Sequence, residues 1–248
     1  MYCRCGTNRS HRQRRKAGGV VKLVYALYEI AMELKENSGH YLCIEQPKAY
    51  AEIISNLYQQ CNGGEGGAII SDGTKALSLS KQAVMIVEPF SLQFDTRKIN
   101  TQLFKELEEI AQDGYYMDYL ELQGHLKQFM ERLMGEVPYP LNYDEEATIQ
   151  GLCKWLNVHI DDSSASLAER VSNYLELMAQ LCQTKVAFLV GSENYLTREE
   201  RQALQKMANY LKIYIVYITN HLDMLAASDS YCVIDADYCI ITNGEESL

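Results

Sequence analysis

The alternation of apolar and polar residues between positions 185 and 220 predicts a strand, a helix and a second strand. Val186–Val190 is an unbroken apolar run, which is typical of a strand buried on both faces. Thr197 and Glu200 stand three apart, as in a capping box, and apolar residues at helical spacing follow them. Residues 213–218 form a second β-branched and aromatic run. We therefore predict a βαβ unit whose strands pair in parallel through a right-handed crossover.

The pattern before residue 95 indicates further strands and one helix. Alternation within 22–35 favours a strand, although its alanine, leucine and glutamate content would also suit a helix. Residues 40–45 predict a short strand, and Pro47 suits the first position of a helix with apolar residues along one face. Asp72-Gly73 predicts a hairpin turn, and 83–87 another buried strand.

The character of the chain changes after Phe94, where helical spacing replaces short apolar runs. We predict one helix capped by Asp95, a second over 117–133 and a third over 145–156. A fourth opens at Ser166, with Glu169 at capping-box spacing, and carries an apolar stripe suited to packing on another helix.

These elements predict an α/β protein with an inserted helical domain. The α/β head comprises residues 21–95 and 184–248 and has a mainly parallel sheet, closed by strands at 232–234 and 238–242. The helical leg covers 96–183, a plausible domain length, and residues 1–20 form a basic tail.

Composition indicates a globular protein of a reducing compartment. Hydrophobic residues make up 47% of the 248 residues, and no apolar run is long enough to span a bilayer. No signal peptide is visible, so we expect a cytoplasmic protein. The eight cysteines include no C-x-x-C pair, and several sit within apolar runs. Cys3-x-Cys5 with His11 could suggest a metal site, but the usual spacing and a fourth ligand are missing.

Charge argues against nucleic-acid binding by the chain as a whole. The formal net charge is −10, and six of the 23 basic residues stand in the first 19, which leaves 33 acidic residues against 17 basic ones afterwards. Such a body repels nucleic acid unless cations gather on one surface or metal ions mask the carboxylates. The basic tail is either a nucleic-acid arm or, as we favour, a disordered extension.

The glycine cluster at 63–67 fails as a phosphate loop. A phosphate loop follows a strand and opens a helix, whereas these glycines follow a helix and precede a strand. The strand-to-helix junction at 45–48 has no glycine and no Gly-Lys-Ser/Thr. A helix stop and flexible turn is the better interpretation.

Three stretches resemble the Csn-two family of type II-A CRISPR systems. They are YLCIEQPKAYAEIISNLYQQ, LSLSKQAVMIVEPFSLQFDTRKINTQLFKELEEI, and YLTREERQALQKMANYLKIYIVYITN with the VIDADYCIIT that follows. The resemblance implies a homotetrameric ring with a P-loop-ATPase-like head that lacks a functional phosphate loop, and a helical leg. It further implies binding of double-stranded DNA ends, Ca²⁺ in the ring, and spacer acquisition alongside the CRISPR integrase pair and effector nuclease. No nuclease or ATPase activity is expected.

The resemblance places calcium ligands before the third leg helix. Asp144 and Glu145 match acidic positions of the family, and Glu136 is a weaker match. Asn142 and Gln150 stand where relatives more often carry carboxylates, and fewer charges weaken a calcium site. The alternative is that the acidic run is the negatively charged first turn of a helix.

The sequence supplies no motif for DNA contacts, so the candidates are the cations of the leg and one at the start of the first head helix. Each alone is as well explained as a solvated surface charge, because phosphate binding requires several cations acting together. The candidates are Lys48, Lys98, Lys105, Lys127, Arg132 and Lys154.

Three hypotheses follow. The leading one is a non-enzymatic, ring-forming binder of double-stranded DNA ends in CRISPR adaptation. The second is a nucleotide-dependent enzyme, against which the missing Gly-Lys-Ser/Thr argues. The third is a protein scaffold without DNA binding, which Asn142 and Gln150 keep open.

Overall fold

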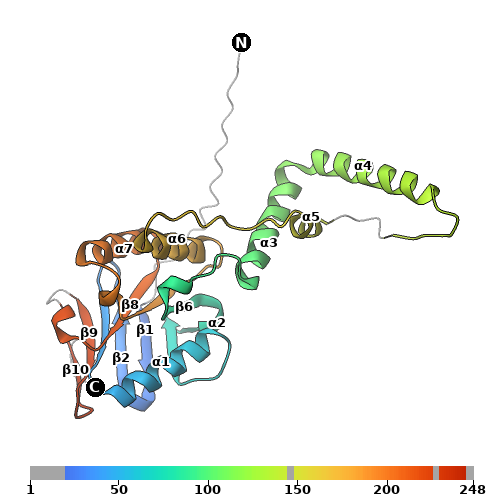
Figure 1. Cartoon of the computed structure of the whole chain (residues 1–248). Helices are drawn as coiled ribbons and strands as arrows, with labels where there is room; N and C mark the ends of the chain where they lie inside the picture. The colour runs from blue at the N-terminus through green and yellow to red at the C-terminus, as the bar shows by residue number, and fades with distance from the viewer. Residues whose placement is uncertain (1–19, 144–147, 226–228, 244–248) are drawn as a thin grey trace.

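The computed structural model describes residues 20–143, 148–225 and 229–243, and its centre is a six-stranded sheet (Figure 1). The strand order is β10-β9-β3-β8-β7-β6, and every neighbouring pair is parallel except β9 and β10. The sheet is therefore mainly parallel, as predicted. Its strands are β3 His40–Ile44, β6 Ala83–Ile86, β7 Val186–Val190, β8 Tyr214–Thr219, β9 Ser230–Ile234 and β10 Ile240–Thr242.

The predicted βαβ unit is present, with its strands paired in parallel. All five residues of β7 are buried, and β7 pairs in parallel with β8. Between them lies α7 Arg198–Leu211, whose capping box is complete. The Glu200 amide donates to Thr197 Oγ1 at 3.2 Å, and the Thr197 amide donates to Glu200 Oε2 at 2.7 Å.

The ambiguous stretch 22–35 was predicted as one strand, but it forms two strands joined by a turn, and both belong to a second sheet of order β2-β1-β4-β5. A short 3₁₀ turn, η1 Ala26–Tyr28, reverses the chain between the first two strands, and Glu29 follows it with φ of 51°. A half-buried strand is favoured over a helix because alternate residues of both strands pack inward. This antiparallel sheet consists of β1 Val21–Tyr25, β2 Ile30–Leu34, β4 Ala68–Asp72 and β5 Lys75–Leu77.

The two faces of the six-stranded sheet carry separate cores. One face packs against the antiparallel sheet together with α1 Pro47–Cys61 and the short α2 Leu79–Gln82. The other face packs against α7 and α6 Leu167–Gln180. Ile99, which precedes both helices in the chain, also belongs to this core. The short 3₁₀ turns η2 Pro89–Ser91, η3 Ser192–Asn194 and η4 Leu222–Met224 lie in the connections.

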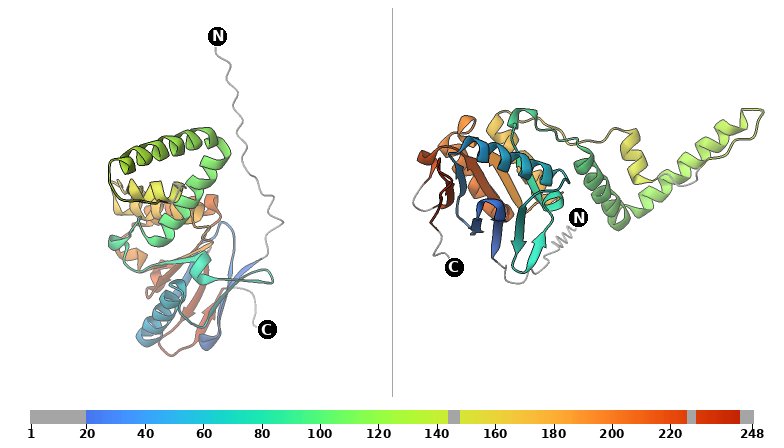
Figure 2. Two further views of the ribbon diagram at one scale, coloured as in Figure 1. Left: turned by 90° about the vertical axis from the view of Figure 1, so that its right-hand side faces the viewer. Right: turned by 90° about the horizontal axis from the view of Figure 1, so that it is seen from below.

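Three helices form an arm that projects from this head (Figure 1 and the right view of Figure 2). They are α3 Arg97–Gly114, α4 Tyr116–Gly135 and α5 Ile149–Trp155. Two predicted starts were wrong. Thr96 rather than Asp95 caps α3, because the Thr96 hydroxyl accepts from Ile99 N at 3.4 Å. The third helix begins at Ile149 rather than 145, because Thr148 has extended backbone and its hydroxyl caps the helix.

Helix α6, expected as the last helix of the leg, packs on the head. Val171, Leu175 and Met178 lie in the same core as the central strands β7 and β8 and helix α7, and each is at most 2% exposed. Its cap is as predicted at Ser166, whose hydroxyl accepts from Glu169 N at 3.1 Å. The apolar stripe of α6 therefore faces a helix, as predicted, and also the head sheet.

None of the helices within the described ranges is long and apolar enough to cross a membrane. Four of the described cysteines are buried, namely Cys43, Cys153, Cys182 and Cys232. The basic tail up to position 19, which contains Cys3, Cys5 and His11, lies outside the described residues.

The head should lose stability in mild acid because of one buried histidine. His40 is 1% exposed; its Nε2 accepts from Lys35 N at 2.8 Å, and its Nδ1 lies 3.2 Å from Ile215 O. Burial lowers the pKa of His40 from 6.5 to about 4, so the folded state resists a proton that the unfolded state accepts. The contribution is complete above pH 6.5 and is lost as the pH falls toward 4, by about 3 kcal/mol.

Denaturant unfolding between pH 7.5 and 4 measures this effect. A His40→Gln variant can keep both hydrogen bonds but cannot titrate, and we expect a flatter dependence of its unfolding free energy on pH. Parallel curves for the two proteins would show that His40 does not govern the acid sensitivity.

Candidate functional site

At the junction between β3 and α1, a side chain occupies the first amides of the helix. β3 is followed only by Glu45 and Gln46 before α1 begins at Pro47. Gln46 Oε1 accepts from Lys48 N at 2.6 Å and from Ala49 N at 3.4 Å. These are N–H groups of the kind that bind an anion at a helix N-terminus, so the amide oxygen of Gln46 takes the place of a phosphate.

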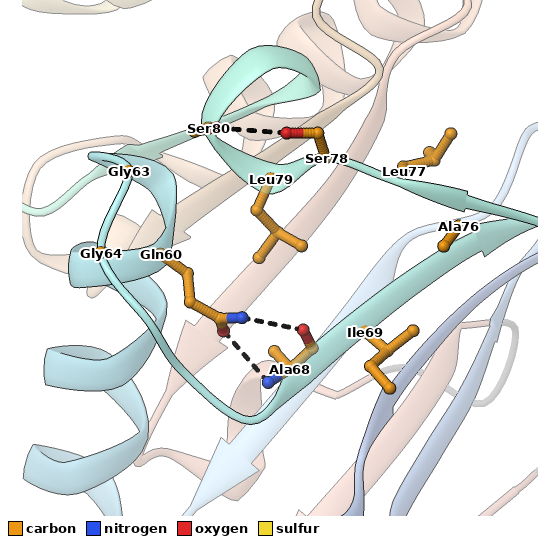
Figure 3. A pocket seen from close by; sticks show the side chains of 10 residues that line it. All are labelled: Gln60, Gly63, Gly64, Ala68, Ile69, Ala76, Leu77, Ser78, Leu79 and Ser80. Carbon is orange, nitrogen blue, oxygen red and sulfur yellow. Dashed lines mark hydrogen bonds between the residues drawn. The ribbon is translucent and has the colours of Figure 1, made fainter.

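The glycine cluster is a helix stop and turn, as predicted, and it shapes a shallow cavity (Figure 3). Asn62 ends α1 and Gly63 has φ of 91°. The Gln60 amide both donates to Ala68 O and accepts from Ala68 N at 3.0 Å, and a Cβ at Gly66 would collide with the Gln60 side chain. The cavity of about 270 Å³ has no charged side chain among its lining residues, so it offers nothing to neutralise a phosphate.

A polar cluster follows β7 at the carboxyl edge of the sheet. Glu193 Oε1 accepts from Thr219 Oγ1 at 2.7 Å, which joins the ends of β7 and β8. Burial raises the pKa of Tyr195, and the neighbouring Glu193 carboxylate raises it further. Ser192 Oγ, Glu193 Oε2 and Tyr195 Oη are buried without a partner in the part of the chain that the structure describes. A carboxylate and neutral hydroxyl groups do not favour the binding of a negatively charged nucleotide phosphate.

Two of the five predicted calcium ligands, Asp144 and Glu145, lie outside the described residues. Glu136 ends α4 at the outer end of the arm, whereas Gln150 is in α5, which packs beside α3 (Figure 1). Gln150 Nε2 donates to Glu108 Oε2 at 2.8 Å, and Asn142 Oδ1 accepts from Tyr143 N. Glu136 and Gln150 therefore lie on different parts of the arm (Figure 1). Within the described ranges, no group of three or more His, Cys, Asp or Glu could hold a metal.

The predicted DNA-binding cations fall on both parts of the molecule. Lys48 is exposed in the first turn of α1, at the edge of the head. Lys98 is half-buried, and its Nζ donates to Ser80 O at 3.1 Å, so it ties α3 to α2. This contact gives Lys98 a structural role, and Lys48 remains the better placed of the two for a ligand.

The other four cations lie on the arm without forming a basic surface. Lys105 and Lys154 are exposed on α3 and α5, while Lys127 is half-buried on α4. Arg132 is exposed on α4, and its Nε donates to Gln128 O at 3.3 Å. The three arm helices together carry six basic and seven acidic side chains. A single arm therefore has no excess of positive charge with which to attract DNA.

The arm instead exposes large apolar side chains. Helix α4 has no buried residue. An apolar cavity of about 290 Å³ lies between α3 and α5, with Leu107 and Leu152 in its lining, and Trp155 beside it is 76% exposed. An apolar surface of this extent is typical of a protein–protein interface.

Sequence reasoning missed the most regular part of this surface, on α4. The residues have alternating spacings of four and three, which is the heptad pattern of a coiled coil. We call these six residues the α4 seam: Tyr115, Tyr119, Leu122, Leu126, Phe129 and Leu133. The spacing was available from the sequence, but only the structure shows that the seam is partly open to solvent.

Comparisons with solved structures and with protein families show what the chain is similar to. It is similar to a bacterial Atm1-family ABC exporter with ATP bound, at 14% identity and a TM-score of 0.42; the match covers 88% of this chain and 37% of that chain. The sequence model of the CRISPR-associated protein family Cas_Csn2 matches residues 60–238, which is well over half of the chain and includes the arm and most of the head. The chain therefore belongs to the CRISPR-associated Cas_Csn2 family.

Proposed function

We propose that this protein binds the ends of double-stranded DNA as a homotetrameric ring during spacer acquisition in type II-A CRISPR immunity. Membership of the Cas_Csn2 family is the observation that carries the proposal. The CRISPR integrase pair and the effector nuclease are its proposed partners. A ring suits a free DNA end because it can be threaded onto the end and can contact the backbone without reading bases.

The apolar arm supports self-association. An acidic chain gains a positive surface only when basic side chains from several copies face one space. Lys48, Lys105 and Lys154 are exposed and available for such an arrangement. Assembly therefore supplies what one arm lacks, since phosphate binding requires several cations together.

We further propose that the protein is not an enzyme and that its head is a P-loop-ATPase-like domain without a working phosphate loop. The Gln46 side chain supports this, because it occupies the α1 N–H groups that a nucleotide phosphate would need. Calcium binding near Asp144 and Glu145 is proposed from the family resemblance alone.

A mobility shift with linear and closed-circular DNA of one sequence, each with calcium and with a chelator, tests the proposal. We expect binding to linear DNA only, weakened by salt as phosphate contacts require and lost with the chelator. Equal binding to both DNA forms would contradict end recognition. Unchanged binding with the chelator would contradict the calcium proposal alone.

A protein scaffold without DNA binding is the second candidate. The near-balance of six basic and seven acidic side chains on the arm helices favours it. Tetramers that bind neither DNA form in the same assay would establish this alternative over the first.

A further inference from the structure

The polar cluster that follows β7 contains a carboxylate oxygen without a counter-charge. Glu193 Oε1 accepts from Thr219 Oγ1 at 2.7 Å, and Thr219 Oγ1 in turn accepts from His221 N at 3.1 Å. These contacts use the single hydroxyl proton of Thr219. The other carboxylate oxygen, Glu193 Oε2, is buried without a hydrogen-bond partner, and Glu193 has no ion pair among the residues that the structure describes.

Two neutral oxygens belong to the same turn as this carboxylate. Ser192 and Tyr195 stand at the two ends of η3, and Tyr195 N donates to Ser192 O at 3.3 Å. Residues three apart in a 3₁₀ turn lie on the same side of it. Ser192 is 1% exposed, and both Ser192 Oγ and Tyr195 Oη are buried without a partner in the described ranges. One turn of the chain therefore holds three oxygen atoms that lack a partner.

The surroundings of Glu193 are electronegative. Burial raises the pKa of Tyr195, and the Glu193 carboxylate raises it further. Burial also raises the pKa of Cys43 to about 11, and the carboxylates that follow β3, β7 and β8 add to this rise. These carboxylates are Glu45, Glu193 and Asp223. No lysine or arginine of the described chain lowers either pKa, so this edge of the sheet gathers negative charge that no neighbouring side chain neutralises.

Arg201, near the start of α7, does not supply the missing charge. Its guanidinium donates to Leu196 O at 2.6 Å and to Met224 Sδ at 3.7 Å. An ionised carboxylate that is buried without a counter-charge is costly. A water molecule would satisfy the hydrogen bonding of Glu193 Oε2 but not its charge, whereas a bound cation satisfies both.

We propose that this cluster binds a monovalent alkali cation, K⁺ or Na⁺, through Glu193 Oε2, with Ser192 Oγ and Tyr195 Oη as neutral ligands. Alkali cations are bound by oxygen atoms, and one carboxylate balances one positive charge. Mg²⁺ and Ca²⁺ generally draw on more carboxylates or on a substrate phosphate. Within the described ranges, Glu45 and Asp223 do not complete a metal-binding group of three with Glu193.

The cation stands at the edge of the sheet where α/β proteins bind their ligands, outside the carboxyl ends of the strands. At this edge Gln46 occupies the α1 amides that would hold an anion, while Glu193 presents a negative charge. The head therefore keeps a ligand site here for an ion of the opposite sign. This inference does not depend on the proposed DNA binding, and the site is separate from the Ca²⁺ binding proposed near Asp144.

Thermal unfolding of the full chain in chloride salts of K⁺, Na⁺ and tetramethylammonium, at equal ionic strength and with a chelator, tests the proposal. Tetramethylammonium is too large to enter a buried site. We expect K⁺ or Na⁺ to raise the unfolding temperature by about 3–5 °C over tetramethylammonium when the cation is present at roughly ten times its Kd. Equal unfolding temperatures in all three salts overturn the proposal.

Glu193→Gln separates cation binding from a merely structural role. Glutamine can keep the contact with Thr219 but carries no charge. The variant should lose the cation dependence and, in tetramethylammonium, unfold at or above the temperature of the unsubstituted protein, because a buried charge without a counter-charge is gone. The same loss of stability in every salt would show a structural role only and overturn the proposal. The matched control Glu199→Gln, exposed in the first turn of α7, should keep the full cation dependence.

Rubidium gives a direct readout that needs no substitution. Crystals of the unsubstituted protein soaked in Rb⁺ should show an anomalous diffraction peak beside Glu193 Oε2. An ordered water at this position without anomalous signal would mean that the cluster is hydrated and binds no cation.

Discussion

Leu175→Ala is expected to lower the free energy of unfolding by about 3 kcal/mol, although the residue lies in a helix whose sequence suggested the leg. Leu175 is fully buried in the core formed by α6, α7 and the central strands. Deleting a leucine side chain at such a site costs its burial and leaves a cavity, together about 2–5 kcal/mol. Denaturant unfolding followed by circular dichroism measures the change.

Leu120→Ala is the matched control. It removes the same atoms from α4, outside the seam, where Leu120 is 41% exposed. We expect a change within about 0.5 kcal/mol, as is usual for surface sites. Equal destabilisation by the two substitutions would show that α6 is not anchored in the head.

The second large effect is expected from placing charge in the α4 seam. Leu122→Lys with Phe129→Lys should convert the assembled protein into smaller species, because two lysines on each copy would have to be desolvated within an apolar contact. Sedimentation or light scattering measures the mass, and DNA-end binding should fall with assembly if the ring is required.

Glu121→Lys with Gln128→Lys adds two lysines to another face of the same helix and should leave the mass unchanged. Helical content and the unfolding midpoint of the head should be retained in both double variants, because neither touches a buried residue. An unchanged mass for the seam variant would exclude α4 from the interface.

The elements of the head were predictable because their determinants are local. An unbroken apolar run fixed β7, and the Thr197–Glu200 box fixed the start of α7. The errors of start at Asp95 and 145 share one cause. In both cases a threonine that follows the acidic residue is the cap, and the choice depends on which residue has extended backbone in the folded chain.

The candidate site was less predictable than the fold. Lys98 looked like any cation of the insertion, and only its contact with Ser80 O gives it a structural role. The role of Gln46 was not predicted, because a glutamine caps a helix only when its side chain turns back and accepts from the next amides. Glu108 emerged as the partner of Gln150 from 42 positions away.

The sequence by itself determined most strands and helices, the caps at Ser166 and Thr197, and the absence of a glycine-lysine phosphate loop, because these follow from neighbouring residues. It did not determine what each apolar stripe contacts. The stripes of α6 and α4 have the same kind of spacing, yet α6 crosses the head sheet and is buried, while α4 leads away from the head and remains exposed (Figure 1). Only the tertiary structure decided this, because burial depends on the path of the whole chain.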